Sequence, residues 1–304
     1  MQPRRFGSTG LTVSPLGLGT MTWGRDTDAH DAGEMVRAFL DSGGTVIDTA
    51  ASYADGAAEE IIAGLLHTGI ARRDVVLVGK SGVQRTASGS LVLNAGRGAL
   101  LDDLDASLVR LGTDHLDLWL VQAPDRLTPA SETATALEIA VRSGRARYVG
   151  VSNYPGWASA QIAGLMSSSG SGIGLAGLEV EYSLLERGIE REVIPAAQAL
   201  GLGVIGWSGL GRGVLTGKYR RVRPADSRAA SAHLRAFVEP YLTEQAAAIV
   251  QALSVAAGGL GQPPLAVAPG WARDAPGMSS VLIGPRNAIQ LSAALEATAL
   301  ELPP

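Results

Sequence analysis

Eight short apolar runs alternate with longer stretches of helical periodicity along this chain of 304 residues. The runs lie at residues 16–19, 45–48, 75–79, 116–121, 148–152, 178–181, 203–207 and 280–283. Between them, segments such as "AHDAGEMVRAFLDSG" and "ALLDDLDASLVRLG" place apolar residues at i, i+3, i+4 and i+7 and end near glycine. Strands that are each followed by a helix pair in parallel through crossover connections.

Closing eight such units predicts an α/β fold, a (β/α)8 TIM barrel formed by a single domain over residues 1–304. The stretch "RRFGSTGLTVS" predicts a β-hairpin ahead of the first barrel strand. The alternative is a doubly wound open sheet, which usually carries G-x-G-x-x-G after its first strand. The corresponding segment "LGLGTMTWG" does not match that motif, so the barrel is favoured.

Composition excludes several classes of partner. The net charge of −4 argues against nucleic acid or an anionic membrane surface. The four histidines lack metal-ligand spacing, so we expect no metal. The first ten residues lack a signal-peptide core, no apolar run approaches about 18 residues, and there is no cysteine. These features predict a cytoplasmic protein that acts on a small molecule, and they leave its oligomeric state open.

In such a barrel the site lies at the carboxyl ends of the strands. Asp48 ends the second run, Tyr53 follows it, and Lys80 comes directly after "VVLVG". Burial of the Lys80 ammonium requires a carboxylate such as Asp48, and a nearby cation lowers the pKa of a phenol. The three residues therefore predict a proton relay. A structural ion pair beside a rim tyrosine explains the same spacing equally well.

Seven segments, in order along nearly the whole chain, resemble the signature segments of aldo-keto reductases. They are "LGLGTMTWG", "DTAASYADGAAEE", "VVLVGKSG", "RYVGVSNYP", "LEVEYSLLER", "GLGRGVLTGKY" and "SSVLIGPRN". The resemblance implies a (β/α)8 barrel that reduces carbonyl groups with NADPH. It also implies that Tyr53 is the general acid and that Lys80, paired with Asp48, lowers the pKa of Tyr53.

The resemblance further implies the cofactor site. Ser152 and Asn153 would bind the carboxamide, Trp207 would stack on the nicotinamide, and Arg286 would favour NADPH by binding its 2′-phosphate. The other implied cofactor residues are Thr20, Met21, Glu179, Ser208, Leu210, Gly211, Gly213, Lys218, Gly284 and Gln290. The irregular segment 208–240 either closes over the cofactor or forms a solvated surface. Its basic residues are Arg212, Lys218, Arg220, Arg221, Arg223, Arg228 and Arg235.

This sequence departs from the family pattern at the proposed site. Gln122 occupies the position of the usual catalytic histidine, and its amide donates a hydrogen bond but cannot exchange a proton at neutral pH. Glu179 replaces a glutamine, and as a carboxylate it would favour the oxidised, positively charged nicotinamide unless it is protonated. Ala294 replaces an asparagine near the adenine. Pro269–Gly270 should break or kink a helix.

The leading hypothesis is an NADPH-dependent oxidoreductase that reduces a carbonyl, a conjugated C=C bond or an imine of a small organic substrate. Gln122 would take the fourth catalytic position, and Trp23 and Tyr154 would form an apolar substrate wall, whereas core packing explains Trp119 at least as well. A first alternative is a cofactor-binding protein with a regulatory role and little turnover. A second is a non-redox reaction with Tyr53 and Glu179 as acid and base.

Overall fold

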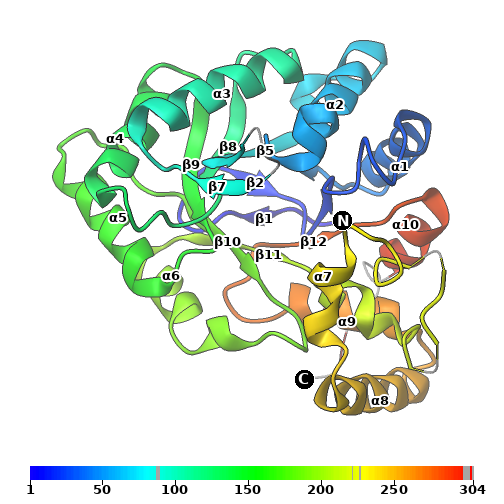
Figure 1. Ribbon diagram of the computed structural model, residues 1–304. Coiled ribbons are helices and arrows are strands. Elements are labelled where there is room, and N and C mark those ends of the chain that lie inside the picture. The colour runs from blue at the N-terminus through cyan, green and yellow to red at the C-terminus, as the bar shows by residue number, and fades with distance from the viewer. Residues whose placement is uncertain (87–89, 221, 226, 297–301, 303–304) are drawn as a thin grey trace.

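The computed structural model describes residues 1–86, 90–220, 222–225, 227–296 and 302; Arg221, one of the basic residues named above, lies outside them. Eight parallel strands form a closed barrel, as predicted (Figure 1). In order around the barrel they are β3 (Leu16–Gly19), β4 (Val46–Asp48), β5 (Val76–Ser81), β8 (Leu116–Val121), β9 (Ala146–Ser152), β10 (Gly177–Glu181), β11 (Gly203–Trp207) and β12 (Ser280–Ile283), which pairs with β3.

Helices surround the barrel on the outside (Figure 1). Seven of them follow individual strands: α1 (Ala29–Asp41), α2 (Ala57–Thr68), α3 (Arg97–Leu111), α4 (Ala130–Arg142), α5 (Gly156–Ser168), α6 (Val193–Leu200) and α10 (Ala288–Leu295). The connection from β11 to β12 holds α7 (Arg235–Val238), α8 (Glu244–Gly259) and α9 (Pro264–Arg273). Short 3-10 helices are η1 (Tyr53–Gly56), η2 (Arg72–Asp74), η3 (Gly188–Glu190), η4 (Gly211–Thr216) and η5 (Glu239–Tyr241). No described helix is both long and apolar enough to cross a membrane.

The predicted N-terminal hairpin is present as β1 (Arg4–Arg5) and β2 (Thr12–Val13), which pair antiparallel. Its turn brings Phe6 under the barrel, where this side chain is fully buried. A Cβ atom at Gly177 would lie 2.2 Å from the Phe6 ring, and one at Gly203 would lie 2.4 Å from it. Strands β10 and β11 therefore begin with glycine because the ring that closes the base of the barrel leaves no room for a side chain.

A second small antiparallel sheet was not predicted. It consists of β6 (Val83–Arg85) and β7 (Leu91–Leu93), between β5 and α3.

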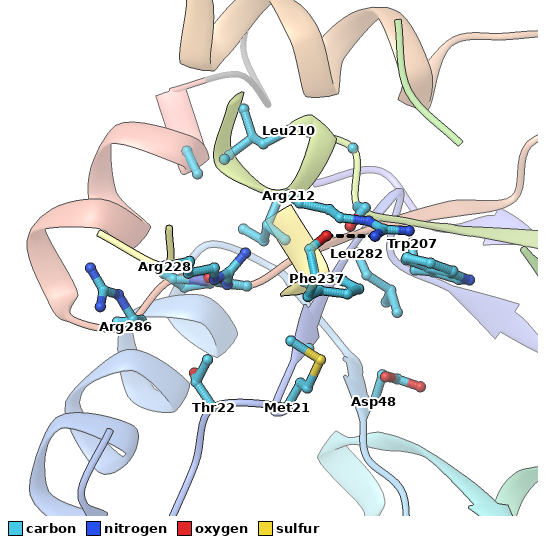
Figure 2. A pocket seen from close by; sticks show the side chains of 18 of the residues that line it. Met21, Thr22, Asp48, Trp207, Leu210, Arg212, Arg228, Phe237, Leu282 and Arg286 are labelled. Atoms are coloured by element: carbon cyan, nitrogen blue, oxygen red, sulfur yellow. Dashed lines mark hydrogen bonds between the residues drawn. The ribbon is translucent and has the colours of Figure 1, made fainter. Parts of the chain in front are cut away.

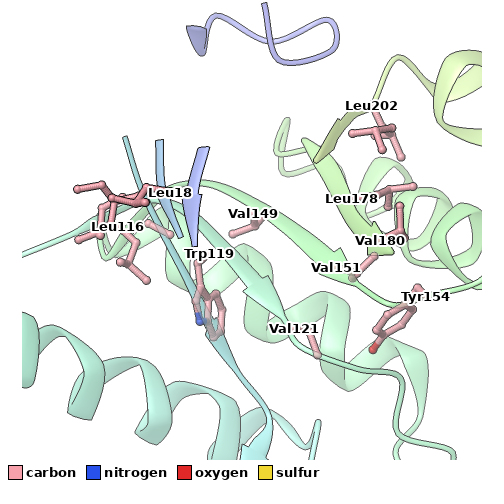
Figure 3. Close-up of a cluster of buried hydrophobic side chains, with 14 of the residues drawn as sticks. Leu18, Leu116, Trp119, Val121, Val149, Val151, Tyr154, Leu178, Val180 and Leu202 are labelled. Carbon is pink, nitrogen blue, oxygen red and sulfur yellow. The ribbon is translucent and has the colours of Figure 1, made fainter. Parts of the chain in front are cut away.

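The largest apolar cluster lies between the strands and the helices that cover them (Figure 3). Trp119 on β8 is fully buried there, and its indole nitrogen donates a 2.9 Å hydrogen bond to Ser81 Oγ. Each fully buried Leu, Val or Ile in such a cluster contributes about 1.5–3 kcal/mol. This packing holds the strand ends, and the polar residues on them, in fixed positions.

Of the prediction that Pro269–Gly270 breaks or kinks a helix, the break was wrong. Helix α9 runs from Pro264 to Arg273 without interruption, and both residues are buried within it. A proline in this position removes one hydrogen bond, the one to the carbonyl group four residues earlier. The helix retains bonds on either side, from the Val267 amide to Pro263 and from the Asp274 amide to Gly270, so one missing bond does not end it.

Candidate active site

A cavity of about 530 Å³ opens at the carboxyl ends of the barrel strands. Six of the polar and aromatic residues that line it come from six different strands or the loops directly after them: Asp48, Lys80, Gln122, Ser152, Glu179 and Trp207. Figure 2 shows Asp48 and Trp207 toward one side of this cavity and Arg228 and Arg286 toward the other. The cavity therefore has two chemically different ends.

The first end holds three buried ionisable groups. The Lys80 ammonium contacts the Asp48 carboxylate in a short ion pair, and Glu179 Oε2 lies 3.2 Å from the same Lys80 Nζ. All three side chains are at most 3% exposed. The Lys80 ammonium also lies 5.4 Å from the centre of the Tyr53 ring. The proton-relay residues predicted from the sequence thus lie together, with Glu179 as an additional member.

Burial and charge shift the pKa values of these groups. Burial raises the pKa of the Tyr53 phenol above its ordinary value; Lys80 opposes this shift, and the charges of Asp48 and Glu179 add to it. Burial alone would lower the pKa of Lys80, but Asp48 and Glu179 raise it above its ordinary value. Lys80 therefore lowers the pKa of Tyr53, as predicted, but burial raises that pKa by more.

Gln122 is held by hydrogen bonds on its backbone and on its side chain. Its backbone N–H donates to the Ser81 carbonyl at 2.9 Å, and its backbone carbonyl accepts from Asn153 Nδ2 at 2.9 Å. Ser52 Oγ donates to the side-chain oxygen, Oε1, at 3.1 Å. Because that oxygen already accepts a hydrogen bond, the amide NH2 of the side chain remains available as a donor in the cavity that Gln122 lines.

Trp207 is held at the floor of the cavity by Asn153. The indole nitrogen donates to Asn153 Oδ1 at 3.0 Å, and Asn153 Nδ2 also donates to Ser152 Oγ at 3.1 Å. Asn153 has a φ angle of 62°, a left-handed conformation that asparagine adopts more readily than most residues. This local fold places the Trp207 ring beside one amide group, that of Asn153, and one hydroxyl group, that of Ser152.

The second end of the cavity is cationic. Lys218, Arg228 and Arg286 line it, and Arg228 donates a 2.7 Å hydrogen bond to the Gly284 carbonyl. Burial and the neighbouring Arg286 guanidinium lower the pKa of Arg228. Gln290, at the start of α10, accepts from the Arg286 amide at 3.0 Å. Cations brought together in a partly buried site favour a polyanionic ligand.

Glycine keeps this end open. A Cβ atom at Gly213, where φ is 93°, would lie 3.6 Å from Lys218 Nζ, and one at Gly284 would lie 3.0 Å from the Arg228 guanidinium. Side chains at these two positions would occupy the space beside the cations. The backbone can therefore approach a phosphate group closely, as anion sites in proteins require.

Several described residues of segment 208–240, between β11 and α8, line the cavity. Arg212 bonds both Glu181 carboxylate oxygens, at 2.8 and 2.6 Å, and donates to the Phe237 carbonyl at 2.6 Å (Figure 2). Its guanidinium lies 4.1 Å from the centre of the Phe237 ring. Farther along, His233 Nε2 lies 2.9 Å from Asp26 Oδ2 in the loop after β3. The segment is thus joined to the end of β10 and to the loop after β3.

The basic residues of this segment divide between the two roles that the sequence left open. Arg212, Lys218 and Arg228 line the cavity. Three others that the structure describes form contacts outside the cavity: Arg220 bonds Gln251, and Arg223 and Arg235 pair with Glu239 at 4.0 and 3.5 Å.

Four of the predicted site residues do not line the cavity. Trp23 and Tyr154, predicted as a substrate wall, lie in the apolar cluster behind the strands, 0% and 6% exposed (Figure 3 shows Tyr154). Thr20 is fully buried beside the cavity, and Gly211 is packed against Leu185. The other predicted residues line it: Met21, Asp48, Tyr53, Lys80, Gln122, Ser152, Asn153, Glu179, Trp207, Ser208, Leu210, Gly213, Lys218, Gly284, Arg286 and Gln290. Ala294, named as a departure from the family pattern, lines it as well.

Several residues of the site were not predicted from the sequence, among them Ser52, Glu181 and Phe237. Ser52 orients Gln122, Glu181 holds Arg212, and Phe237 lines the cavity from α7. Ser52 and Glu181 lie one and two residues from predicted site positions, so proximity was the only signal for them. Phe237 lies in an irregular segment with no periodicity to place it.

Within the described part of the chain, no cluster of His, Asp and Glu is arranged to hold a metal ion.

The turn that carries Tyr53 has an unusual backbone. Ala54, Asp55 and Gly56 are consecutive residues with positive φ angles of 47°, 56° and 97°. Such a conformation costs roughly 1–2 kcal/mol for each residue other than glycine. Two ion pairs hold the turn: Arg85 to Asp55 at 2.6 Å and Arg110 to the buried Glu59 at 2.6 Å. The position of Tyr53 therefore depends on contacts outside the cavity.

Comparisons with known proteins agree with this geometry. The model of the Aldo/keto reductase family matches residues 15–304. An uncharacterized oxidoreductase of Bacillus subtilis, YrpG, is 35% identical over 99% of this chain and 92% of its own. A probable voltage-gated potassium channel subunit beta of rice (Oryza sativa) is 34% identical over 93% and 87%, and the L-glyceraldehyde 3-phosphate reductase of Escherichia coli is 32% identical over 98% and 87%. The chain belongs to the Aldo/keto reductase family.

Proposed function

We propose that this chain is an NADP(H)-dependent oxidoreductase of the cytoplasm. It reduces the carbonyl group, or a conjugated C=C or C=N bond, of a small organic substrate. The observation that carries the proposal is the two-ended cavity, in which a tyrosine, a lysine and two carboxyl groups face one end and three cations face the other. A chain without cysteine needs no oxidising compartment.

The residues present fit NADP(H). The cationic end, with the space left by Gly213 and Gly284, suits the pyrophosphate and the 2′-phosphate, and Arg286 offers the planar donors that a phosphate accepts. Trp207 provides a flat surface for the nicotinamide, and the Ser152 and Asn153 side chains provide partners for its carboxamide. When bound, the cofactor supplies the hydride.

The remaining steps belong to the chain's own groups. Tyr53 donates its phenolic proton to the substrate oxygen, and the Lys80 ammonium 5.4 Å from its ring stabilises the phenolate that forms. Asp48 keeps Lys80 charged in its buried position. The side-chain amide NH2 of Gln122 donates a hydrogen bond to the same substrate oxygen. It orients the substrate without exchanging a proton.

The test is consumption of NADPH with a panel of aldehydes, enones and cyclic imines. Tyr53→Phe should lower kcat/KM by roughly 10²–10⁴-fold, because it removes the general acid, and leave NADPH binding unchanged. Tyr148→Phe, on β9 and away from the cavity, serves as the matched control. A Tyr53→Phe variant with full activity would contradict the assignment.

A second function is favoured by one observation, the exchange of a proton-transferring histidine for Gln122. A protein with this site that binds NADP(H) and turns over slowly would act as a sensor of the cofactor. The rice relative, a probable potassium channel subunit beta, supports keeping this candidate. Tight NADPH binding without consumption on any member of the panel would select it over the reductase.

A further inference from the structure

Glu179 brings a second carboxyl group to a single buried ammonium. Asp48 and Glu179 both contact Lys80 Nζ, the latter at 3.2 Å, and none of the three side chains is more than 3% exposed. One ammonium balances one carboxylate. If all three groups were ionised, the trio would carry an uncompensated negative charge away from water, which is costly.

A proton on Glu179 is the simplest way to remove this excess charge. Asp48 makes the closer contact with Lys80 and is the better candidate to stay ionised. Burial raises the pKa of Glu179 to about 8; Asp48 adds to the shift and Lys80 opposes it. Glu179 is therefore the group of this trio that exchanges its proton most readily near neutral pH.

The surroundings of Glu179 offer little other compensation. The adjacent strands place Ser152 on β9 and Ile205 on β11 opposite Glu179 in register, and neither side chain titrates near neutral pH. Tyr53, from the turn after β4, is the remaining titratable group that acts on the trio. Arg212, which also lines the cavity, is bound to Glu181. Among the described residues, Lys80 is thus the cation that Glu179 contacts.

We propose that Glu179 makes this cavity distinguish the oxidised from the reduced nicotinamide, by releasing its proton to solvent when the positively charged ring binds. The inference rests on the proposed function, since it requires a nicotinamide beside Trp207. The oxidised ring carries a positive charge that the reduced ring lacks. That charge takes the place of the proton as the partner of the excess carboxylate. NADPH brings no such charge, so its binding leaves the proton on Glu179.

The sign of the pH dependence follows from this exchange. Since NADP⁺ binding releases a proton, the affinity for NADP⁺ rises with pH until free Glu179 is ionised, near its pKa of about 8, and then levels off. NADPH affinity lacks this rise. The two forms share the 2′-phosphate and the adenine, so the titration of those groups cancels in the ratio of the two dissociation constants.

The experiment is calorimetric titration with NADP⁺ and with NADPH, without substrate, at about pH 6.5 and about pH 9. In the wild-type protein the ratio Kd(NADPH)/Kd(NADP⁺) should rise roughly fivefold or more, within the limit of about tenfold per pH unit for one proton. In Glu179→Gln it should change by less than about twofold. Glu60→Gln removes an exposed carboxylate on α2 and should behave as the wild type.

A second readout needs no variant. Titration at pH 7 in two buffers of different ionisation enthalpy should show proton release with NADP⁺ and none with NADPH, which keeps the test valid if Glu179→Gln fails to fold. A pH-independent ratio in the wild type, or an unchanged pH dependence in Glu179→Gln, would overturn the inference. Failure to bind either form would instead overturn the proposed function.

Discussion

At the scale of single residues, hydrogen-bond direction decides what Gln122 offers to a substrate. A glutamine side chain has a donor end and an acceptor end, and the two are interchangeable by rotation. In this structure the Ser52 hydroxyl donates to Gln122 Oε1 at 3.1 Å, which leaves the side-chain NH2 group as the end that can donate. The donor end is the one that a carbonyl substrate requires. Ser52 is therefore a positioning residue for Gln122.

Ser52→Ala should lower kcat/KM for the best substrate by roughly 2–12-fold, the equivalent of one net hydrogen bond of about 0.5–1.5 kcal/mol. A double-mutant cycle separates positioning from a general structural effect. In a Gln122→Ala background the same Ser52→Ala change should have no further effect on kcat/KM. Equal losses in both backgrounds would show that Ser52 does not act through Gln122.

Gln122→His should increase the rate of simple aldehyde reduction, because an imidazole both donates a hydrogen bond and exchanges a proton near neutral pH. Initial rates with a small aliphatic aldehyde and saturating NADPH measure this. The gain can reach roughly 10²-fold if proton transfer limits the reaction. A lower rate would mean that the cavity is shaped for a substrate that glutamine suits better.

At the scale of elements, the short turn η1 places Tyr53 at a cost in backbone strain. Ala54 and Asp55 both have left-handed φ angles that glycine adopts more easily. Two ion pairs lie at or next to the turn, Arg85 with Asp55 and Arg110 with Glu59 at the start of α2. The sequence "YADG" gives no sign of the strain, because the single glycine follows the two strained residues.

Ala54→Gly should raise the free energy of unfolding by up to about 1 kcal/mol. The relief of left-handed strain, about 1–2 kcal/mol, exceeds the entropy that glycine adds to the unfolded chain, about 0.4–1 kcal/mol. Chemical denaturation measures the change. Ala256→Gly, at an exposed position within α8, is the control and should lower stability by about 1 kcal/mol. Destabilisation at Ala54 as well would show that the turn is not strained in solution.

At the scale of the whole molecule, alternation of strands and helices was enough to predict the barrel. Polar residues at strand ends then predicted most of the cavity lining, because a closed parallel barrel brings all those ends to one face. The sequence could not locate Trp23 and Tyr154, since an aromatic residue next to a strand end can turn toward the cavity or the helices. Nor could it predict the contacts of Arg212, which depend on a long irregular segment folding back across the barrel.

From the cationic end of the cavity we predict that the protein prefers NADPH to NADH and that this preference is measurable as a difference in the rise of Tm. NADPH should raise Tm more than NADH at equal concentration, because ligand binding stabilises in proportion to the logarithm of concentration over Kd. Arg286→Ala should weaken NADPH binding about tenfold or more, the loss of a charge-assisted hydrogen bond, and narrow the difference in Tm. Arg97→Ala, at an exposed position on α3, should leave both shifts unchanged. Equal shifts with NADPH and NADH in the wild type would contradict a 2′-phosphate site.

Most residues of the two ends of the cavity come from different parts of the gene, although Glu179 and Trp207 at the first end follow α5. Asp48, Tyr53, Lys80 and Gln122 precede α5, whereas the three cations, Lys218, Arg228 and Arg286, follow β11. Recombination between relatives at the connection from α5 to β10 would therefore exchange the cationic end, together with Glu179 and Trp207, and keep Asp48, Tyr53, Lys80 and Gln122. In such a barrel, the residues at the cationic end and most residues around Tyr53 can be exchanged independently during evolution.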